Sequence, residues 1–143
     1  MSSGWEASGQ RYFTIPVCAS CRCSATKSRA CWQNYGPRRF YGNIASVVGL
    51  QVLHDSPERL QLSDGAGSFT FVPGDRPTEN VHLAFGVGNL DAVVRFHEVA
   101  TAAGYADNGP PGERPQYHPG YYGAFVLDAD GHNVEAVFHD RTT

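Results

Sequence analysis

Alternating hydrophobic and polar positions predict β-strands along much of the chain. Residues 12–17 and 81–87 place apolar side chains at every second position, the spacing that turns one face of a strand toward a core. Five further runs have strand character: 50–54, 59–62, 68–72, 121–127 and 134–139. Asp64–Gly67 and Asp130–Asn133 each separate two of these runs with residues that favour tight turns, so we expect antiparallel hairpins at both places.

One helix is predicted clearly in the second half of the chain. Asn89 is a favourable N-cap for a helix over Leu90–Ala103, and Gly104 is a typical stop. Four residues are expected to form the stripe that faces the core: Leu90, Val93, Val94 and His97.

Proline and glycine limit regular structure in two other places. A helix is expected within 29–48, with interruptions at Gly36-Pro37 and at Gly42. Prolines confine 105–120 to loop or edge-strand structure, because a proline cannot donate to a central ladder. They are Pro110, Pro111, Pro115 and Pro119.

The order of elements repeats within the chain. Each half follows the order strand, helix, three strands, and the turn at Asp64-Gly65 corresponds to the one at Asp130-Gly131. The sequence therefore predicts an α+β fold of two βαβββ modules in a single domain, 1–143. The first module spans 11–74, with an atypical part at 18–48, and the second spans 80–140. With each helix on one face of a four-stranded sheet, the opposite faces form a curved mixed sheet around a cleft.

Composition and charge narrow the class of protein. Hydrophobic residues make up 41% and charged residues 17%, and no apolar run approaches the roughly 20 residues of a membrane span, so we expect no membrane segment. The first six residues lack the features of a secretory signal, and we expect a cytoplasmic protein. Basic residues are in excess before residue 47, but they are scattered, so no nucleic-acid partner is expected.

All four cysteines lie early in the chain, at Cys18, Cys21, Cys23 and Cys31. Cys18 and Cys21 have the spacing that opens many zinc sites, but no second spaced pair follows. Reduced thiols of a cytosolic protein are the alternative interpretation, which the expected compartment favours.

Glu135 is the residue in the last strand that most needs an explanation. It lies among apolar positions of a half-buried strand, with Val134 and Ala136 beside it. A carboxylate there is costly unless it is solvated, paired or bound to a metal. An ion pair with His82 on the polar face of an earlier strand would satisfy it without any metal.

Two stretches resemble the vicinal oxygen chelate superfamily, which includes glyoxalases, extradiol dioxygenases and bleomycin-resistance proteins. They are Val81–Phe85 and Tyr117–Val137. The resemblance, closest to small bacterial glyoxalase-like proteins, implies paired βαβββ modules and a divalent metal held by the first and last strands of the modules. On that pattern His82 and Glu135 are metal ligands, and an imidazole with a carboxylate suits zinc, iron, manganese, nickel or cobalt.

The first module departs from this pattern. Tyr12 stands where the resemblance places a ligand on the first strand, and Phe69 or Thr70 stands on the last strand, depending on register. None of these is a favourable ligand, so either a nearby histidine completes the site or the metal site has lapsed. The candidate histidines are His54, His118 and His139.

Four residues are candidates for substrate binding: Arg114, His118, Tyr121 and Tyr12. Together with Tyr117, the first three flank a strand of the expected cleft and suit an anionic or carbonyl-bearing ligand; ordinary packing of an aromatic loop is the alternative.

The sequence favours a small-molecule enzyme in which a metal polarises neighbouring substrate oxygens, of lyase, isomerase or dioxygenase type. The alternative is a metal-free protein that sequesters a ligand, of the bleomycin-resistance kind. A homodimer is expected, because related modules often pair between chains and the strands at 50–72 leave an open sheet edge.

Overall fold

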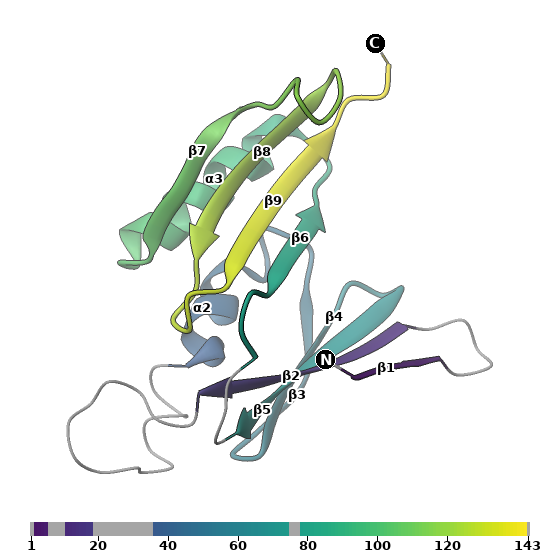
Figure 1. Ribbon diagram of the computed structural model, residues 1–143, viewed down its shortest axis with the longest axis vertical. Helices are drawn as coiled ribbons and strands as arrows, with labels where there is room; N and C mark the ends of the chain where they lie inside the picture. The colour runs from purple at the N-terminus through teal and green to yellow at the C-terminus, as the bar shows by residue number, and fades with distance from the viewer. Residues whose placement is uncertain (1, 6–10, 19–35, 75–77, 143) are drawn as a thin grey trace.

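The computed structural model describes residues 2–5, 11–18, 36–74 and 78–142 of the 143 residues. Nine strands and two helices lie in this part of the chain (Figure 1). The strands are β1 (Ser2–Trp5), β2 (Arg11–Cys18), β3 (Gln51–Ser56), β4 (Arg59–Ser63), β5 (Gly67–Gly74), β6 (His82–Gly86), β7 (Ala106–Glu113), β8 (Tyr121–Leu127) and β9 (Asn133–His139). The helices are α2 (Pro37–Ile44) and α3 (Leu90–Ala102).

The strands form two sheets with the same internal order. The first sheet has the order β1-β2-β5-β4-β3, and the second has the order β6-β9-β8-β7. In each module the first strand runs parallel to the last, β2 beside β5 and β6 beside β9, and the other pairings within the module are antiparallel. The predicted α+β fold of paired βαβββ modules is confirmed, with β1 as an additional edge strand of the first sheet.

Helix α3 confirms the predicted capping, and of the four residues of the predicted core-facing stripe it buries Val93. The side chain of Asn89 accepts a hydrogen bond of 2.8 Å from the backbone N–H of Ala92, and Gly104 has a left-handed φ of +93° after the last turn. The buried residues of α3 are Val93, Phe96 and Ala100. Leu90, which was predicted to face the core, is 47% exposed.

Helix α2 starts where an interruption was predicted. Pro37 occupies the first turn, where the missing N–H leaves no hydrogen bond unmade, and Gly42 is accommodated within the helix. The predicted interruption at Gly42 was therefore wrong, whereas at Gly36-Pro37 the backbone is not helical until Pro37 begins the helix. Residues 29–35 of the predicted helical region lie outside the described part of the chain.

One hydrophobic core extends across both modules. Tyr41 and Phe40 from α2 are fully buried, and the ring of Tyr41 lies 6.5 Å from that of Phe85 on β6. Phe69 of the first sheet lies 5.7 Å from the same Phe85 ring. Because helix-facing side chains of both sheets meet in this core, the opposite face of the second sheet is left for other contacts.

Strand β7 fits the prediction of an edge for 105–120. It pairs only with β8 among the described strands, and its register shifts twice along the ladder, where Gly109 and the two prolines Pro110 and Pro111 lie. Prolines fit here because the outer edge needs no donors.

Candidate functional site

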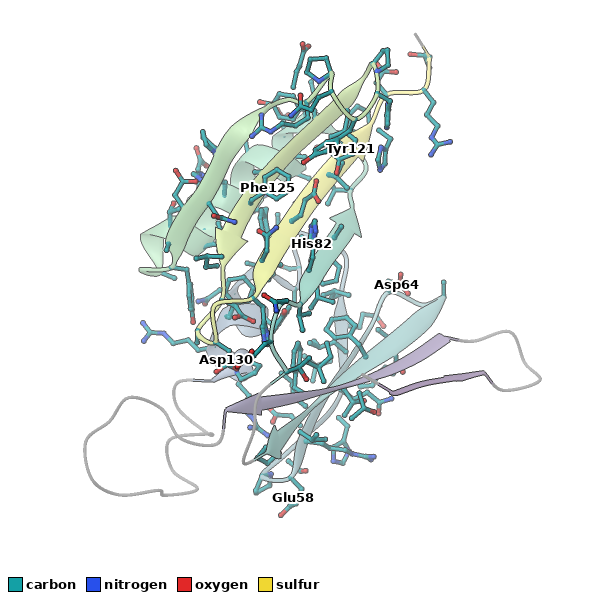
Figure 2. The ribbon with its side chains drawn as sticks, viewed as in Figure 1. Glu58, Asp64, His82, Tyr121, Phe125 and Asp130 are labelled. Atoms are coloured by element: carbon teal, nitrogen blue, oxygen red, sulfur yellow. The ribbon has the colours of Figure 1, made fainter. Side chains whose placement is uncertain are left out.

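The face of the second sheet opposite α3 carries the predicted site residues, and we call it the open face. Helix α3 lies behind this sheet in Figure 1 and contacts β7, β8 and β9. Val134 and Ala136 of β9 are fully buried in the core on the helix side. The alternation of a strand therefore places Glu135, between them, on the open face. Figure 2 shows His82, Phe125 and Tyr121 along this face.

Glu135 is the centre of the site. Only 1% of the residue is exposed, although it lies on the open face, because neighbouring side chains cover it. Its Oε2 lies 2.9 Å from Nε2 of His82, and its Oε1 accepts a hydrogen bond from the phenol of Tyr121. Both carboxylate oxygens thus have hydrogen-bond partners within the chain, and these hydrogen bonds offset the free-energy cost of burying the carboxylate.

Tyr121 is held in its protonated form. Burial is the largest cause that raises its pKa well above the ordinary value, and the hydrogen bond and negative charge of Glu135 act in the same direction. The positive charge of Arg114 lowers the pKa and is outweighed. Tyr121 therefore keeps its proton and remains a donor to Glu135 at neutral pH.

His82 joins the buried carboxylate to the exterior of the site. Its side chain is 50% exposed, whereas that of Glu135 is 2% exposed. In the neutral imidazole, donation from Nε2 to the carboxylate leaves Nδ1 with a free lone pair. The pair can thus act as an oriented base. In the other tautomer, with the proton on Nδ1, Nε2 of His82 and the carboxylate of Glu135 can both be ligands of a metal ion.

Phe125 covers Glu135 from the neighbouring strand. The two residues are direct partners in the β8–β9 ladder, and the Phe125 ring lies 6.2 Å from that of His82. Phe125 was not among the site residues predicted from the sequence. The hairpin predicted from Asp130–Asn133 contained the signal, because cross-strand partners lie on one face.

Arg114 lies over the same ring. Its guanidinium carbon is 5.7 Å from the centroid of Phe125, the range of a cation–π contact. Together, Arg114, Phe125 and Tyr121 lie with His82 and Glu135 on one face, so the structure brings two of the predicted substrate-binding residues to the predicted metal ligands.

His118 and His139 form a separate pair. Nε2 of His118 lies 2.9 Å from Nδ1 of His139, and both rings contact the ring of Tyr121 edge-on. Nδ1 of His118 donates to the carbonyl of Pro119 at 2.6 Å. Neither imidazole is hydrogen-bonded to Glu135, whose partners are His82 and Tyr121.

The other histidines of the described chain lie apart from this site. His54 is on β3, the edge strand of the first sheet. His97 pairs with Asp107 at 3.0 Å, and the buried His132 pairs with Asp128 at 3.1 Å. Within the described part of the chain, no group of three or more His, Cys, Asp or Glu side chains is placed to hold one metal ion.

The first sheet supplies no second set of ligands among its described side chains. Tyr12 pairs with Ser68 and Thr14 with Thr70, as His82 pairs with Asn133 and Ala84 with Glu135. Thr70 is therefore the counterpart of Glu135, which settles the choice of register, and Phe69 packs against the core. Tyr12 lies on β2, and its side chain is outside the described part, as is the cysteine-rich segment beyond Cys18.

A cavity of about 440 Å³ opens beside the site, at the end of the second sheet. Its lining combines aromatic rings and carboxylates, including Tyr121, Tyr122, Phe138, Glu113 and Asp140. Tyr121 also lines this cavity, but Leu90 of α3 and the core-packed Tyr122 and Phe138 place it toward the helix side of the sheet end rather than over Glu135. No described helix is long and apolar enough to cross a membrane.

Comparison with known proteins gives matches among solved structures alone: no protein-family model and no curated protein sequence matches the chain. A glyoxalase/bleomycin resistance protein from Albidiferax ferrireducens T118 is similar with a TM-score of 0.66 and 19% identity, over 90% of this chain and 97% of that chain. A glyoxalase/bleomycin resistance protein/dioxygenase family enzyme from Burkholderia phytofirmans PsJN has a TM-score of 0.61 and 22% identity, over 90% of this chain and 97% of that chain.

The fosfomycin resistance protein FosX from Mesorhizobium loti is also similar, with a TM-score of 0.56 and 15% identity, over 92% of this chain and 90% of that chain. At these identities the similarity is one of fold. The chain therefore has the fold of the vicinal oxygen chelate proteins, and the resemblance carried by Val81–Phe85 and Tyr117–Val137 is confirmed at that level.

Proposed function

We propose that the open face of the second sheet is the active site of a small-molecule enzyme, in which His82 and Glu135 hold a divalent metal ion. The observation that carries this proposal is the meeting of His82 Nε2 and Glu135 Oε2 at 2.9 Å, with the carboxylate braced by Tyr121. An imidazole and a carboxylate are donors for zinc, iron, manganese, nickel or cobalt.

The donor set fits such an ion. Two atoms bound about 2.1 Å from one ion at right angles to each other, as in octahedral coordination, lie about 3 Å apart, which is close to the separation of these two atoms. Tyr121 would fix the orientation of the coordinating carboxylate through Oε1. The described residues leave the other positions to water or to substrate oxygens.

A bound ion would supply Lewis-acid polarisation of neighbouring substrate oxygens, chemistry shared by lyase, isomerase and dioxygenase reactions. The chain's own residues supply the setting. Phe125 and the helix-packed sheet exclude water from the buried side of Glu135, Tyr121 keeps a proton on its phenol, and half-exposed His82 faces the substrate.

The second candidate is a metal-free protein that sequesters its ligand. The direct hydrogen bond between His82 and Glu135 favours it, because both polar groups are already satisfied without an ion.

Metal content decides between the two candidates. Protein purified without chelator and equilibrated with zinc or manganese should retain the ion, and His82→Ala and Glu135→Gln should each lose it while their apo forms melt near the parent temperature. His97→Ala is the matched control, since it removes a histidine–carboxylate pair of similar geometry outside the site. Less than about a tenth of an equivalent in the parent would establish the metal-free alternative.

A further inference from the structure

The guanidinium of Arg114 is fixed above the open face by its own strand. The side chain folds back along the end of β7, where Nη2 donates to the carbonyl of Pro110 at 2.7 Å and Nη1 to the carbonyl of Glu113 at 3.1 Å. Its carbon lies 5.7 Å from the Phe125 ring. Two hydrogen bonds and a ring contact thus hold a long side chain that would otherwise be mobile.

The glycines of β7 leave room for this arrangement. A Cβ on Gly112 would lie 2.8 Å from Nη1 of Arg114, and a Cβ on Gly109 would lie 2.9 Å from Cδ2 of Phe125. Gly109 also has a left-handed φ of +154°. The strand is therefore shaped to receive both the guanidinium and the ring beneath it.

Arg114 has no carboxylate partner among the ion pairs of the described residues. Its two partners are neutral carbonyls, and the side chain is partly buried. Since Arg114 carries five N–H donors, three are left for other acceptors. A preorganised, partly desolvated cation of this kind is a binding group for an anion.

The cation lies at one end of the proposed active site. Its charge acts on the phenol of Tyr121, which is hydrogen-bonded to Glu135. Phe125 separates it from His82, with the guanidinium carbon 5.7 Å and the imidazole ring 6.2 Å from the Phe125 centroid. A small ligand lying along this row can touch the cation with one end and the His82–Glu135 pair with the other.

We propose that Arg114 binds the carboxylate of a small organic monoanion, and that the oxygen-bearing other end of this ligand reaches His82 and Glu135. Only the second half rests on the proposed function. The one positive charge of Arg114 can pair directly with a single negative charge, whereas the second charge of a dianionic phosphate or phosphonate would have no partner and would be repelled by the Glu135 carboxylate on the same face.

Three probes that share a phenyl ring test the carboxylate preference at about pH 8.5 on protein freed of metal by chelator: benzoate, its neutral isostere benzamide, and phenylphosphonate, which is a dianion at that pH. Ligand-observed NMR titration should show benzoate binding about tenfold to a hundredfold more tightly than benzamide, the effect of a charge-assisted hydrogen bond, and more tightly than phenylphosphonate. Equal affinities for benzoate and benzamide would overturn the proposal, and tighter binding of phenylphosphonate would replace the carboxylate with a dianion.

Substitutions test whether Arg114 is the residue that causes the preference for benzoate over benzamide. Arg114→Met keeps an apolar stem but no charge, and should reduce the benzoate preference to near unity; Arg114→Lys should keep part of it. Arg95→Met, at an exposed position of α3, is the control and should leave the preference intact. An unchanged preference in Arg114→Met, with melting like the parent, would overturn the assignment.

The two proposals fail separately. Metal retention in Arg114→Met should equal that of the parent, because the donors are His82 and Glu135. If the parent protein binds benzoate through Arg114 but retains no metal, the carboxylate site at Arg114 is supported and the metal-free, ligand-sequestering function replaces the proposed enzyme.

Discussion

Tyr121 reaches Glu135 across a glycine. The direct partner of Glu135 in the β8–β9 ladder is Phe125, and the direct partner of Tyr121 is His139. Gly123 lies between, and its missing side chain leaves the space through which the Tyr121 phenol donates to Oε1 of Glu135. The orientation of the proposed metal ligand therefore depends on a tyrosine and a glycine that are not proposed ligands of the ion themselves.

Tyr121→Phe removes the donor and keeps the ring. Oε1 of a buried carboxylate then lacks its partner, which should cost about 1–3 kcal/mol of unfolding free energy. Metal affinity should fall by about tenfold to a hundredfold, as for the loss of an orienting partner, and by less than in Glu135→Gln. Thermal melting and metal titration measure both effects. Tyr117→Phe, at a 60% exposed position, is the control, and an equal effect in both variants would contradict the role of the hydrogen bond.

Gly123→Ala fills the gap. Its Cβ would lie 3.0 Å from Oε1 of Glu135 and 3.2 Å from Cε1 of Tyr121, so the phenol or the carboxylate must move. We expect a loss of about 1–3 kcal/mol and weaker metal binding. Gly86→Ala on β6, where nothing lies within 4 Å of the added carbon, is the matched control and should melt like the parent. Normal metal retention in Gly123→Ala would show that the site tolerates the shift.

The sequence predicts those parts of the fold that depend on local alternation. Residues 81–87 and 134–139 alternate cleanly, and their strands, the Asn89 cap and the Gly104 stop appear as expected. The same alternation placed His82 and Glu135 on one polar face, because two parallel strands with matching polarity can share a sheet.

Other features depended on contacts that alternation does not encode. Gly42 predicts an interruption, yet it lies within α2, because the burial of Phe40, Tyr41 and Ile44 stabilises the helix around it. The buried side of α3 contains Phe96 and Ala100 beside the predicted Val93, because the packing of the helix against the sheet decides which side of the helix faces inward. The role of Gly123 could not be predicted from the sequence, because it depends on the positions of the Tyr121 and Glu135 side chains in the folded protein.

Tyr41 carries an unsatisfied group in the core. Its ring is fully buried among aromatic side chains, and its hydroxyl has no hydrogen-bond partner among the described residues. Burial, followed by the negative charges of Asp128 and Asp130, raises its pKa well above the ordinary value. Tyr41→Phe removes the unsatisfied hydroxyl with the ring retained, so the free energy of unfolding should rise by about 1 kcal/mol. A fall in melting temperature would show that the hydroxyl contributes an interaction.

The homodimer expected from the sequence also has a specific test. Strand β3 is an edge of the first sheet and exposes Val52 by 52% and Leu53 by 57%. We propose that a second copy covers this edge. Light scattering should give a dimer mass for the parent and a monomer mass for Leu53→Lys. A parent that is monomeric at micromolar concentration would contradict the proposal.

His132 should make stability depend on pH. Its Nδ1 lies 3.1 Å from Oδ2 of Asp128 and its Nε2 lies 2.7 Å from the carbonyl of Thr78, so both nitrogens face acceptors. Burial alone would lower the pKa of His132, but the hydrogen bond and charge of Asp128 and the Thr78 carbonyl outweigh it, and the pKa is raised above 6.5. The imidazolium thus fastens the β8–β9 turn to the segment that precedes β6.

The sign of the effect follows from that direction. A group whose pKa is higher in the folded than in the unfolded protein stabilises the fold fully below its unfolded pKa, about 6.5, and this contribution is lost as the pH rises through the folded pKa. His132→Gln should therefore lower the free energy of unfolding by about 3 kcal/mol at pH 6 and by less at pH 9. In this variant Asp128 keeps its hydrogen bonds from the backbone N–H groups of Asp130 and residue 132. Chemical denaturation at both pH values, with the partly exposed His97→Gln as control, measures the difference; a cost that is the same at pH 6 and pH 9 would show that His132 is neutral in the folded protein.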